Sequence, residues 1–403
     1  MRITFECLLN RWKEYISYSS HWNPLFPGLR TALELLKKNV SVTLKSSRPP
    51  LDPSTASMGA GGLWMPYHCD DPRTEQWAMQ TLDDLLLTSN IYNKHVEILP
   101  AVAFKKEHSG PEVMDYISQN YDMKGTGGSS PLPSWTTDSR LQFQHLTVEM
   151  LSWQNTIFKL RIPSQEQLVA AGYKHAWFFK TPIVDTPKML SAMFQDIITH
   201  PNTVAIHTDH EYHSMQQVVE DAKALECDAV VNCTSLGAQQ LCDDHQLVPA
   251  RGLLLHFDRH TTPRSYTSCT DPDGANIDLI HDSVLIAEDE PWGTSTEPCY
   301  MIPRGNKLLV GGTFHEGDVR TEMTATERQT LLENAQILGI APHAHVVDEW
   351  VGFRPARPTA RCDLDNTYGS NQGIQVVHSY GYGGSGWTVF VGAAKEVVRL
   401  LGL

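Results

Sequence analysis

The stretch that most restricts the fold lies near the carboxyl end, where an apolar run, a glycine-rich turn and a helical pattern follow one another. Ile374–Val377 has the composition of a buried strand, and four of the seven residues in Tyr380–Gly386 are glycine. Such a turn exposes backbone N–H groups at the positive end of a helix, which suits an anionic or strongly polar ligand. A tight structural turn without a ligand is the alternative interpretation. The apolar face of the helix is marked by Ala393, Val397, Leu400 and Leu401.

Helical and strand patterns alternate elsewhere in the chain. A helix is predicted to begin at Gly28, and β-branched residues alternate along Val40–Leu44 as in a strand. Asp228–Thr234 has the pattern of a short buried strand that runs into a turn. This alternation predicts α/β layers. The helical stripe after Gly28 consists of Leu29, Ala32, Leu33 and Leu36.

Two further segments carry side chains suited to holding an anion. Arg354 and Arg357 each precede a proline, which stiffens the backbone that carries the two guanidinium groups. A fixed arginine grips a carboxylate through two parallel hydrogen bonds, although surface ion pairs are the more common role. Tyr300 lies among apolar residues in Pro298–Pro303, where a core tyrosine is the ordinary interpretation.

Charge and cysteine spacing exclude several classes of protein. The net charge of −14 argues against binding to nucleic acid or to an anionic membrane surface. None of the eight cysteines forms a C-x-x-C pair, so we expect free thiols and no metal site. No run of about 18 apolar residues is present, which argues against a transmembrane helix. The amino terminus does not resemble a secretory signal, and Leu401–Leu403 does not match the S-K-L peroxisomal address.

Taken together, these segments resemble the D-amino-acid oxidase and D-aspartate oxidase family. That family shows a P-Y-x-I-P strand, a strand ending in two glycines, a G-x-R-P-x-R-P segment, and a glycine-rich stretch before its last helix. The resemblance covers about residues 28–403 in consistent order, so chance matching is improbable. The matching segments are Gly61–Trp64 with Pro66-Tyr67, Val230–Thr234, Pro298–Pro303 with Cys299 inserted before Tyr300, Val310–Gly312, Gly352–Pro358 and His378–Gly386.

The resemblance implies a specific activity and a specific site. FAD bound without covalent attachment would take a hydride from the α-carbon of a D-amino acid, and O2 would be reduced to H2O2. The products would be a 2-oxo acid and ammonia. Arg354 and Tyr300 would hold the substrate carboxylate, and the carbonyl of Gly384 would accept a hydrogen bond from the amine. The flavin would lie along Gly28, Gly61, Gly62, Leu63, Gly383, Gly384, Ser385, Gly386, Trp387 and Thr388.

The expected architecture is an α/β, two-domain fold built from interleaved segments. A Rossmann-like FAD-binding domain is expected over residues 1–66, 183–250 and 352–403. A substrate domain with a mixed, largely antiparallel sheet is expected over residues 67–182 and 251–351. The expected partners are a small D-amino acid and O2, with a homodimer left open, in the cytoplasm or in peroxisomes.

The chain departs from the family pattern near its amino terminus. The three glycines of a G-x-G-x-x-G loop would fall at Asn23, Leu25 and Gly28, so only the third is kept. Lys45 and Ser46 follow the next strand, where the family has an acid that binds the ribose. Near the substrate, Thr296 replaces a lid tyrosine for which Trp292 is a substitute, and Met65 replaces a polar residue.

These departures leave alternatives open. A D-aspartate oxidase would need a second cation facing the side-chain carboxylate, and the candidates are His68, Arg251 and Arg357. A flavin-poor, catalytically impaired binding scaffold would account for the missing glycines. An NAD-dependent dehydrogenase is disfavoured, since it depends on the loop that is missing.

Overall fold

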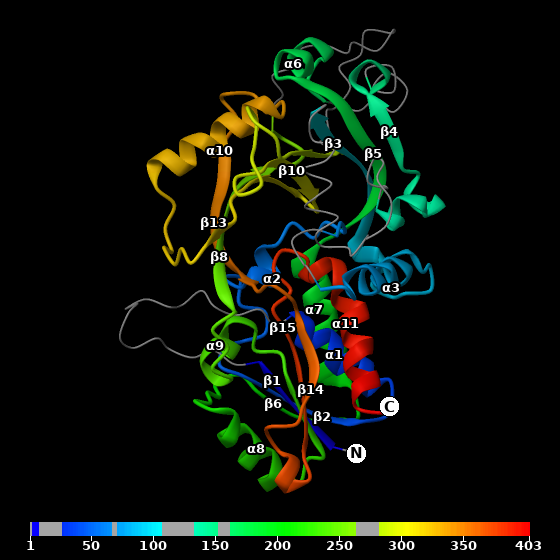
Figure 1. The fold of residues 1–403 in the computed structure, drawn as a ribbon, viewed down its shortest axis with the longest axis vertical. Helices are drawn as coiled ribbons and strands as arrows, with labels where there is room; N and C mark the ends of the chain where they lie inside the picture. Colours follow the sequence, from blue (N-terminus) through cyan, green and yellow to red (C-terminus); the bar gives the residue numbers. More distant parts are fainter. Residues whose placement is uncertain (1, 8–25, 67–70, 107–132, 152–161, 263–281) are drawn as a thin grey trace, which may run out of the picture.

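The computed structural model describes residues 2–7, 26–66, 71–106, 133–151, 162–262 and 282–403. Its side chains are described from residue 27 onward. Two sheets occupy the two halves of an elongated molecule (Figure 1).

The smaller sheet is parallel except at one edge. Its strand order is β14-β15-β7-β1-β2-β6, and only the β14–β15 pair is antiparallel. Strand β1 lies between β2 and β7, which is the place that a dinucleotide-binding fold gives to its first strand. The six strands are β1 (Arg2–Cys7), β2 (Ser41–Ser46), β6 (Thr203–His207), β7 (Ala229–Asn232), β14 (Arg361–Asp365) and β15 (Gln375–Tyr380).

Helices cover both faces of this sheet. Val231 and Val377 pack in the core cluster that contains the helices α1 and α11, whereas their neighbours Val230 and Val376 pack against α8 on the other face. This division follows from the two-residue period of a strand. The α-helices of the described residues, in both halves of the molecule, are α1 (Phe26–Leu36), α2 (Ala56–Gly59), α3 (Thr74–Leu86), α6 (Gln165–Ala170), α7 (Thr186–Thr199), α8 (Met215–Ala224), α9 (Ala238–Leu241), α10 (Ala325–Ile337) and α11 (Gly386–Leu400).

The larger sheet has nine strands and is almost entirely antiparallel. Its order is β12-β8-β11-β10-β9-β3-β5-β4, with β13 also paired to β8, and only the β3–β9 pair is parallel. The strands are β3 (Val96–Lys106), β4 (Gln144–Thr147), β5 (Tyr173–Val184), β8 (Val248–Asp258), β9 (Val284–Ala287), β10 (Cys299–Arg304), β11 (Lys307–Gly311), β12 (His315–Glu316) and β13 (Val346–Ala356).

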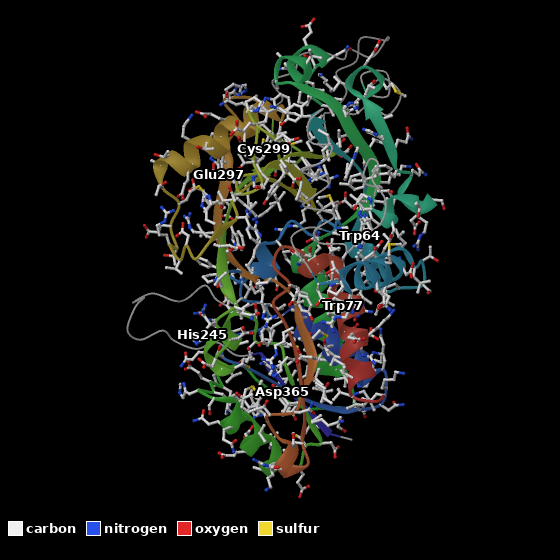
Figure 2. The ribbon with its side chains drawn as sticks, in the orientation of Figure 1. Trp64, Trp77, His245, Glu297, Cys299 and Asp365 are labelled. Carbon is white, nitrogen blue, oxygen red and sulfur yellow. The ribbon has the colours of Figure 1, made fainter. Side chains whose placement is uncertain are left out.

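Two buried tryptophans lie near the join between the two sheets (Figure 2). The indole N–H of Trp64 donates to the carbonyl of Ala78 in α3. Trp77 lies in α3 against α11, where Gly392 provides the space for its backbone. This contact ties α3, whose sequence lies between strands of different sheets, to the last helix.

The predicted fold class is confirmed. The structure has an α/β sheet with helices on both faces and a second, mixed and largely antiparallel sheet. All strands of the smaller sheet fall within residues 1–66, 183–250 and 352–403. The long strands β8 and β13 continue across the expected domain boundaries, so the positions of those boundaries stay a prediction.

Candidate active site

One row of paired residues across the nine-stranded sheet forms a wall of a pocket. Along this row Ile286 pairs with Tyr300, Tyr300 with Gly311, Gly311 with Leu254, and Leu254 with Trp350. Directly opposed residues project to the same face of a sheet. The side chains of this row therefore lie together. They line a pocket of about 190 Å³ and belong to Ile286, Tyr300, Leu254 and Trp350.

The opposite wall comes from loops at the carboxyl edge of the parallel sheet. The segment that follows β15 contributes Gly383 and Gly384, and the loop after β7 contributes Ser235. The loop after α2 adds Gly61 and Gly62. Loops after parallel strands meet at one edge of such a sheet, which is where open α/β folds bind their ligands.

Tyr300 is held at the pocket by glycines on the neighbouring strand. A Cβ atom added to Gly311 or Gly312 would lie 2.6 Å from the Tyr300 hydroxyl oxygen, so only glycine leaves room for the phenol. Burial raises the pKa of the Tyr300 hydroxyl above its usual value, although the nearby Arg354 opposes this shift. The phenol therefore stays protonated at neutral pH and acts as a hydrogen-bond donor.

Arg354 lies at the same pocket and is fixed from three sides. Its Nη1 donates to the carbonyl of Thr313 over 2.7 Å, and its guanidinium carbon lies 5.5 Å from the centroid of the Phe314 ring. A Cβ atom on Gly252 would overlap the guanidinium group. The strand β13 thus presents a positioned cation beside the Tyr300 phenol, a combination suited to a carboxylate.

The glycine-rich segments leave the backbone open to a ligand. A Cβ atom on Gly386, at the first position of α11, would meet no atom within 4 Å, although the residue lines the pocket. No acidic residue occupies the first turn of this 15-residue helix. At Gly62 the φ angle is +71°, and a Cβ atom would overlap the carbonyl of Val184. The N-terminus of α11 and the Gly61–Gly62 loop therefore form a cradle of main-chain groups.

Two buried polar atoms of the pocket have no hydrogen-bond partner among the described residues. They are the hydroxyl oxygen of Ser235, whose side chain is 2% exposed, and the indole Nε1 of Trp350. Buried polar groups are rarely left unpaired, because each costs free energy. The pocket residues consequently fit a ligand that approaches the main chain at the glycine cradle and carries polar groups able to pair with these two atoms.

The structure brings most of the predicted site residues together. Tyr300, Arg354 and Gly384 line the pocket with Gly61, Gly62, Leu63, Gly383, Gly386 and Trp387. Gly28 lies in the first turn of α1, beside the lining residue Pro27. Asn23 and Leu25 lie outside the described residues.

Two predicted residues are placed behind the pocket wall. Ser385 and Thr388 are buried and do not line the pocket. The Thr388 hydroxyl donates to the carbonyl of Met65 over 2.8 Å and accepts from the Met65 N–H over 3.2 Å. Thr388 thus joins α11 to the segment that carries Met65, which itself lines the pocket.

Several pocket residues were not predicted from the sequence. Trp350, Ser235 and Tyr382 line the pocket, as does Glu288. One signal was available, because Trp350, Gly352 and Arg354 alternate along one strand and must share a face. The sequence signal for Ser235 was its place after a buried strand. In the structure its φ angle is +53°.

Three further residues that the sequence analysis singled out, Trp292, Ser46 and Lys45, do not line the pocket. Trp292 packs against Tyr173 and Phe104, with ring centroids 4.9 and 5.9 Å apart, in the second core cluster and not at the pocket. The Ser46 hydroxyl donates to the carbonyl of Arg48 over 2.6 Å. Lys45 is buried and pairs with Asp221 and with the hydroxyl of Tyr212.

Two of the three candidate cations for a D-aspartate site do not line the pocket. Arg251 is fully buried and pairs with Glu327, and Arg357 pairs with Asp244. His68 lies outside the described residues. Among the described residues that line the pocket, Arg354 is the one cationic side chain.

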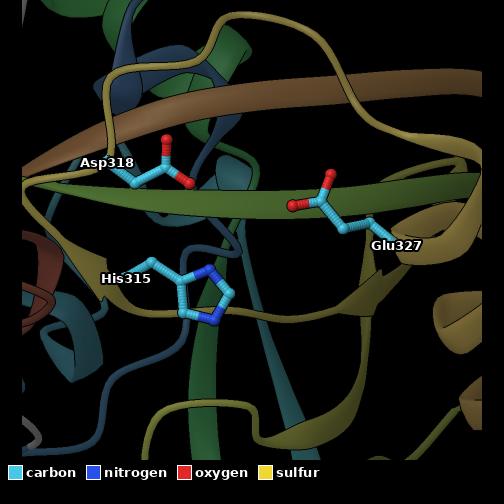
Figure 3. A group of neighbouring side chains, drawn as sticks. All are labelled: His315, Asp318 and Glu327. Atoms are coloured by element: carbon cyan, nitrogen blue, oxygen red, sulfur yellow. The ribbon is translucent and has the colours of Figure 1, made fainter.

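A cluster of His315, Asp318 and Glu327 has ligand atoms within 4.8 Å of one another (Figure 3). The two carboxylates are already paired with guanidinium groups. Arg251 lies 2.7 Å from Glu327, and Arg320 lies 2.6 Å from Asp318. The cluster is therefore an ion-pair network that anchors the start of α10 to β8.

None of the described helices combines the length and the apolar composition needed to cross a bilayer.

Comparisons with known proteins place the pocket in context. The family model described as FAD dependent oxidoreductase matches residues 27–400. A D-amino-acid oxidase of Streptomyces coelicolor is 26% identical over 380 residues, which is 93% of each chain. A D-amino-acid oxidase of Rubrobacter xylanophilus is 24% identical over 377 residues, again 93% of each chain.

A solved structure shows the same fold. The glycine oxidase of Bacillus cereus superposes with a TM-score of 0.64 at 14% identity, covering 100% of this chain and 94% of that one. The family model spans nearly the whole chain, including every described strand except β1 and every described pocket segment. The chain therefore belongs to the FAD dependent oxidoreductase family, and its cofactor is FAD.

Proposed function

We propose that this protein oxidises D-amino acids to 2-oxo acids and ammonia, with O2 reduced to H2O2. The observation that carries the proposal is the pairing of a protonated phenol, Tyr300, with a fixed guanidinium, Arg354, inside a pocket lined by a main-chain cradle. The relatives named D-amino-acid oxidase, which match 93% of the chain, support the choice of substrate class.

In this proposal the chain's own residues orient the substrate. Arg354 and Tyr300 bind the α-carboxylate through charge-assisted hydrogen bonds. The carbonyl of Gly384 accepts from the α-amine, so the α-hydrogen has one fixed direction. Such orientation supplies much of the rate enhancement in a reaction between two bound partners.

The cofactor would be held by the cradle already described. Gly61, Gly62 and Leu63 would approach it from one side, and Gly383, Gly386 and Trp387 from the N-terminus of α11. Ser385 and Thr388 would fix these segments, and Gly28 would serve at the start of α1. When bound, FAD supplies hydride acceptance and the route of electrons to O2.

A test of this function uses purified protein loaded with FAD. We expect each molecule of D-methionine or D-alanine that is oxidised to yield one molecule each of H2O2, ammonia and 2-oxo acid. We expect L-methionine to yield none of these products. Absence of product from every D-amino acid tried would contradict the proposal. Higher kcat/KM on D-aspartate than on D-methionine would favour the acidic substrate, for which the described pocket offers no second cation.

Binding of FAD distinguishes the proposed enzyme from the flavin-poor scaffold. Binding to the folded state alone raises stability by about 2.7 kcal/mol at a ligand concentration of 100 Kd. We therefore expect added FAD to raise the melting temperature and to give the protein a yellow colour after gel filtration. A colourless protein with an unchanged melting temperature would support the scaffold.

A further inference from the structure

Glu288 extends the pocket wall beyond the row that contains Tyr300. In β9, Val284 and Ile286 belong to the core cluster that faces the pocket, whereas Leu285 and Ala287 belong to the cluster on the opposite face. Glu288 comes next in this alternation, on the side of Ile286. Glu288 and Ile286 both line the pocket, so a carboxylate lies next to the apolar wall.

The partner of Glu288 stands behind it on the neighbouring strand. Strand β3 pairs with β9 so that Ala103 faces Ile286, which places Lys105 beside Glu288. Lys105 Nζ lies 3.6 Å from Glu288 Oε2 and 4.9 Å from the centroid of the Trp177 ring. Lys105 is buried and does not line the pocket, whereas Glu288 does.

The ion pair leaves Glu288 able to bind a second cation. A separation of 3.6 Å exceeds the length of an ordinary hydrogen bond. An ionised carboxylate has about four acceptor positions, so one ammonium at this distance does not saturate it. The pair therefore fixes the carboxylate at the pocket.

The distance from the carboxylate clamp fits a long side chain. Tyr300 pairs with Ile286, and Glu288 follows two residues later, just past the end of β9. Its backbone therefore lies about 5 Å across and about 7 Å along the sheet from the backbone of Tyr300. A substrate whose α-carboxylate is bound by Tyr300 and Arg354 would therefore need three or four methylene groups to reach Glu288.

We propose that Glu288 makes this pocket selective for D-amino acids with a cationic side chain, of the D-lysine and D-arginine type. The inference rests on the proposed function and names its substrate class. Among the described lining residues, Arg354 is the one cation and Glu288 the one carboxylate. The pocket thus offers groups that complement both the carboxylate and the distal ammonium of a single ligand, whereas a long apolar side chain would cover the Glu288 carboxylate without adding a hydrogen bond to it.

The competing substrate class is acidic, with Lys105 as the recognising cation. Glu288 lies at the pocket and Lys105 behind it, so an acidic side chain would meet the carboxylate first. Like charges brought together without water repel one another. The acidic class is kept as an outcome of the test.

Kinetics on the FAD-loaded protein compare D-lysine with D-norleucine, which has the same carbon chain without the distal ammonium. We expect kcat/KM for D-lysine to exceed that for D-norleucine at least 10-fold. In Glu288→Gln the ratio should fall close to one. The matched control Glu333→Gln, an exposed carboxylate of α10, should keep the wild-type ratio.

A binding measurement on the wild-type protein needs neither a variant nor turnover. Calorimetry of the FAD-loaded protein would compare 6-aminohexanoate, hexanoate and adipate, which carry an ammonium, a methyl and a carboxylate at the far end. We expect 6-aminohexanoate to bind at least 10-fold more tightly than the other two.

The outcomes separate this inference from the proposed function. Oxidation of D-norleucine as efficiently as D-lysine would overturn the inference and leave the function standing. Tighter binding of adipate would assign recognition to Lys105 and overturn it as well. A protein that oxidises no D-amino acid but prefers 6-aminohexanoate would contradict the function while supporting the cationic pocket. Failure of all three acids to bind, together with no turnover, would overturn both.

Discussion

At the scale of single residues, the phenol of Tyr300 should contribute to substrate binding through one hydrogen bond. Tyr300→Phe keeps the ring that packs beside Gly311 and removes only the donor. A hydrogen bond to a charged group is worth about 1.5–3 kcal/mol, so we expect kcat/KM for D-amino acids to fall roughly 10- to 100-fold. Steady-state kinetics check this, and an unchanged kcat/KM would remove Tyr300 from the site.

The position of the Arg354 guanidinium should depend on a residue that touches no substrate. Gly252→Ala would place a methyl group where the guanidinium now lies. We expect kcat/KM to fall at least about 10-fold because a small misplacement of an orienting group lowers the rate strongly. FAD content and melting temperature, measured on the same sample, should stay close to wild type. Wild-type kinetics would show that the guanidinium has room to move.

Tyr300 and Arg354 were proposed as site residues because their motifs resemble those of the D-amino-acid oxidase family, and both line the pocket. Arg354 precedes a proline, and Tyr300 lies in a recognisable strand. Trp350 and Glu288 were missed because their roles depend on which strands pair. Trp350 reaches the pocket by pairing with Leu254, almost one hundred positions away, and no local pattern specifies that register.

At the scale of elements, the contact between α3 and α11 should be sensitive to one methyl group. A Cβ atom on Gly392 would overlap the backbone of Trp77. Overpacking of this kind costs about 1–3 kcal/mol, so Gly392→Ala should lower the melting temperature although alanine favours helices. Lys395→Ala, at an exposed position of the same helix, is the matched control. An equal or higher melting temperature for Gly392→Ala would show that the helices can move apart.

The join between β8 and α10 should weaken in acid. Burial alone would raise the pKa of Glu327, but hydrogen bonds from Arg251 and Thr324 hold that pKa at about 2. An unfolded glutamate has a pKa of about 4.3, so the unfolded state binds more protons between these values. The stabilisation is complete above about pH 4.3 and is lost as the pH falls toward 2.

Chemical denaturation at pH 5 and pH 3 tests this ion pair. We expect the wild-type protein to lose more unfolding free energy between these two pH values than Glu327→Gln does. The comparison of slopes cancels the contributions of other carboxylates. Identical slopes would mean that Glu327 has the same proton affinity in the folded and unfolded states.

Elements with a strong local period were predicted more reliably than their arrangement. The stripe after Gly28 corresponds to α1, which begins two residues earlier, and the run at residues 374–377 corresponds to β15, which begins one residue later. By its sequence, Met1–Leu9 is compatible with a strand or with the start of a helix, and the pairing of Arg2–Cys7 with β2 and β7 identifies a strand. The order of the nine-stranded sheet was beyond reach, since some of its pairs, such as β8 with β13, join segments about one hundred residues apart.

At the scale of the whole molecule, the pocket exists only where the two sheets meet. One wall is the Ile286–Trp350 row of the antiparallel sheet, and the other is the carboxyl edge of the parallel sheet. Family resemblance predicted the two sheets and the site residues, whereas composition and periodicity predicted only alternating layers. The central claim is that the orienting side chains lie on one sheet and the main-chain cradle on the other.

The most direct test of that claim mixes the FAD-loaded protein with D-lysine or D-methionine in the absence of O2 and follows the flavin absorbance near its visible maximum. We expect the band to bleach with the D-enantiomers and not with the L-enantiomers. With Arg354→Leu the bleaching should be at least about 30-fold slower at low substrate, because a buried charge pair is worth roughly 2–5 kcal/mol. Bleaching at the wild-type rate in this variant would contradict the account.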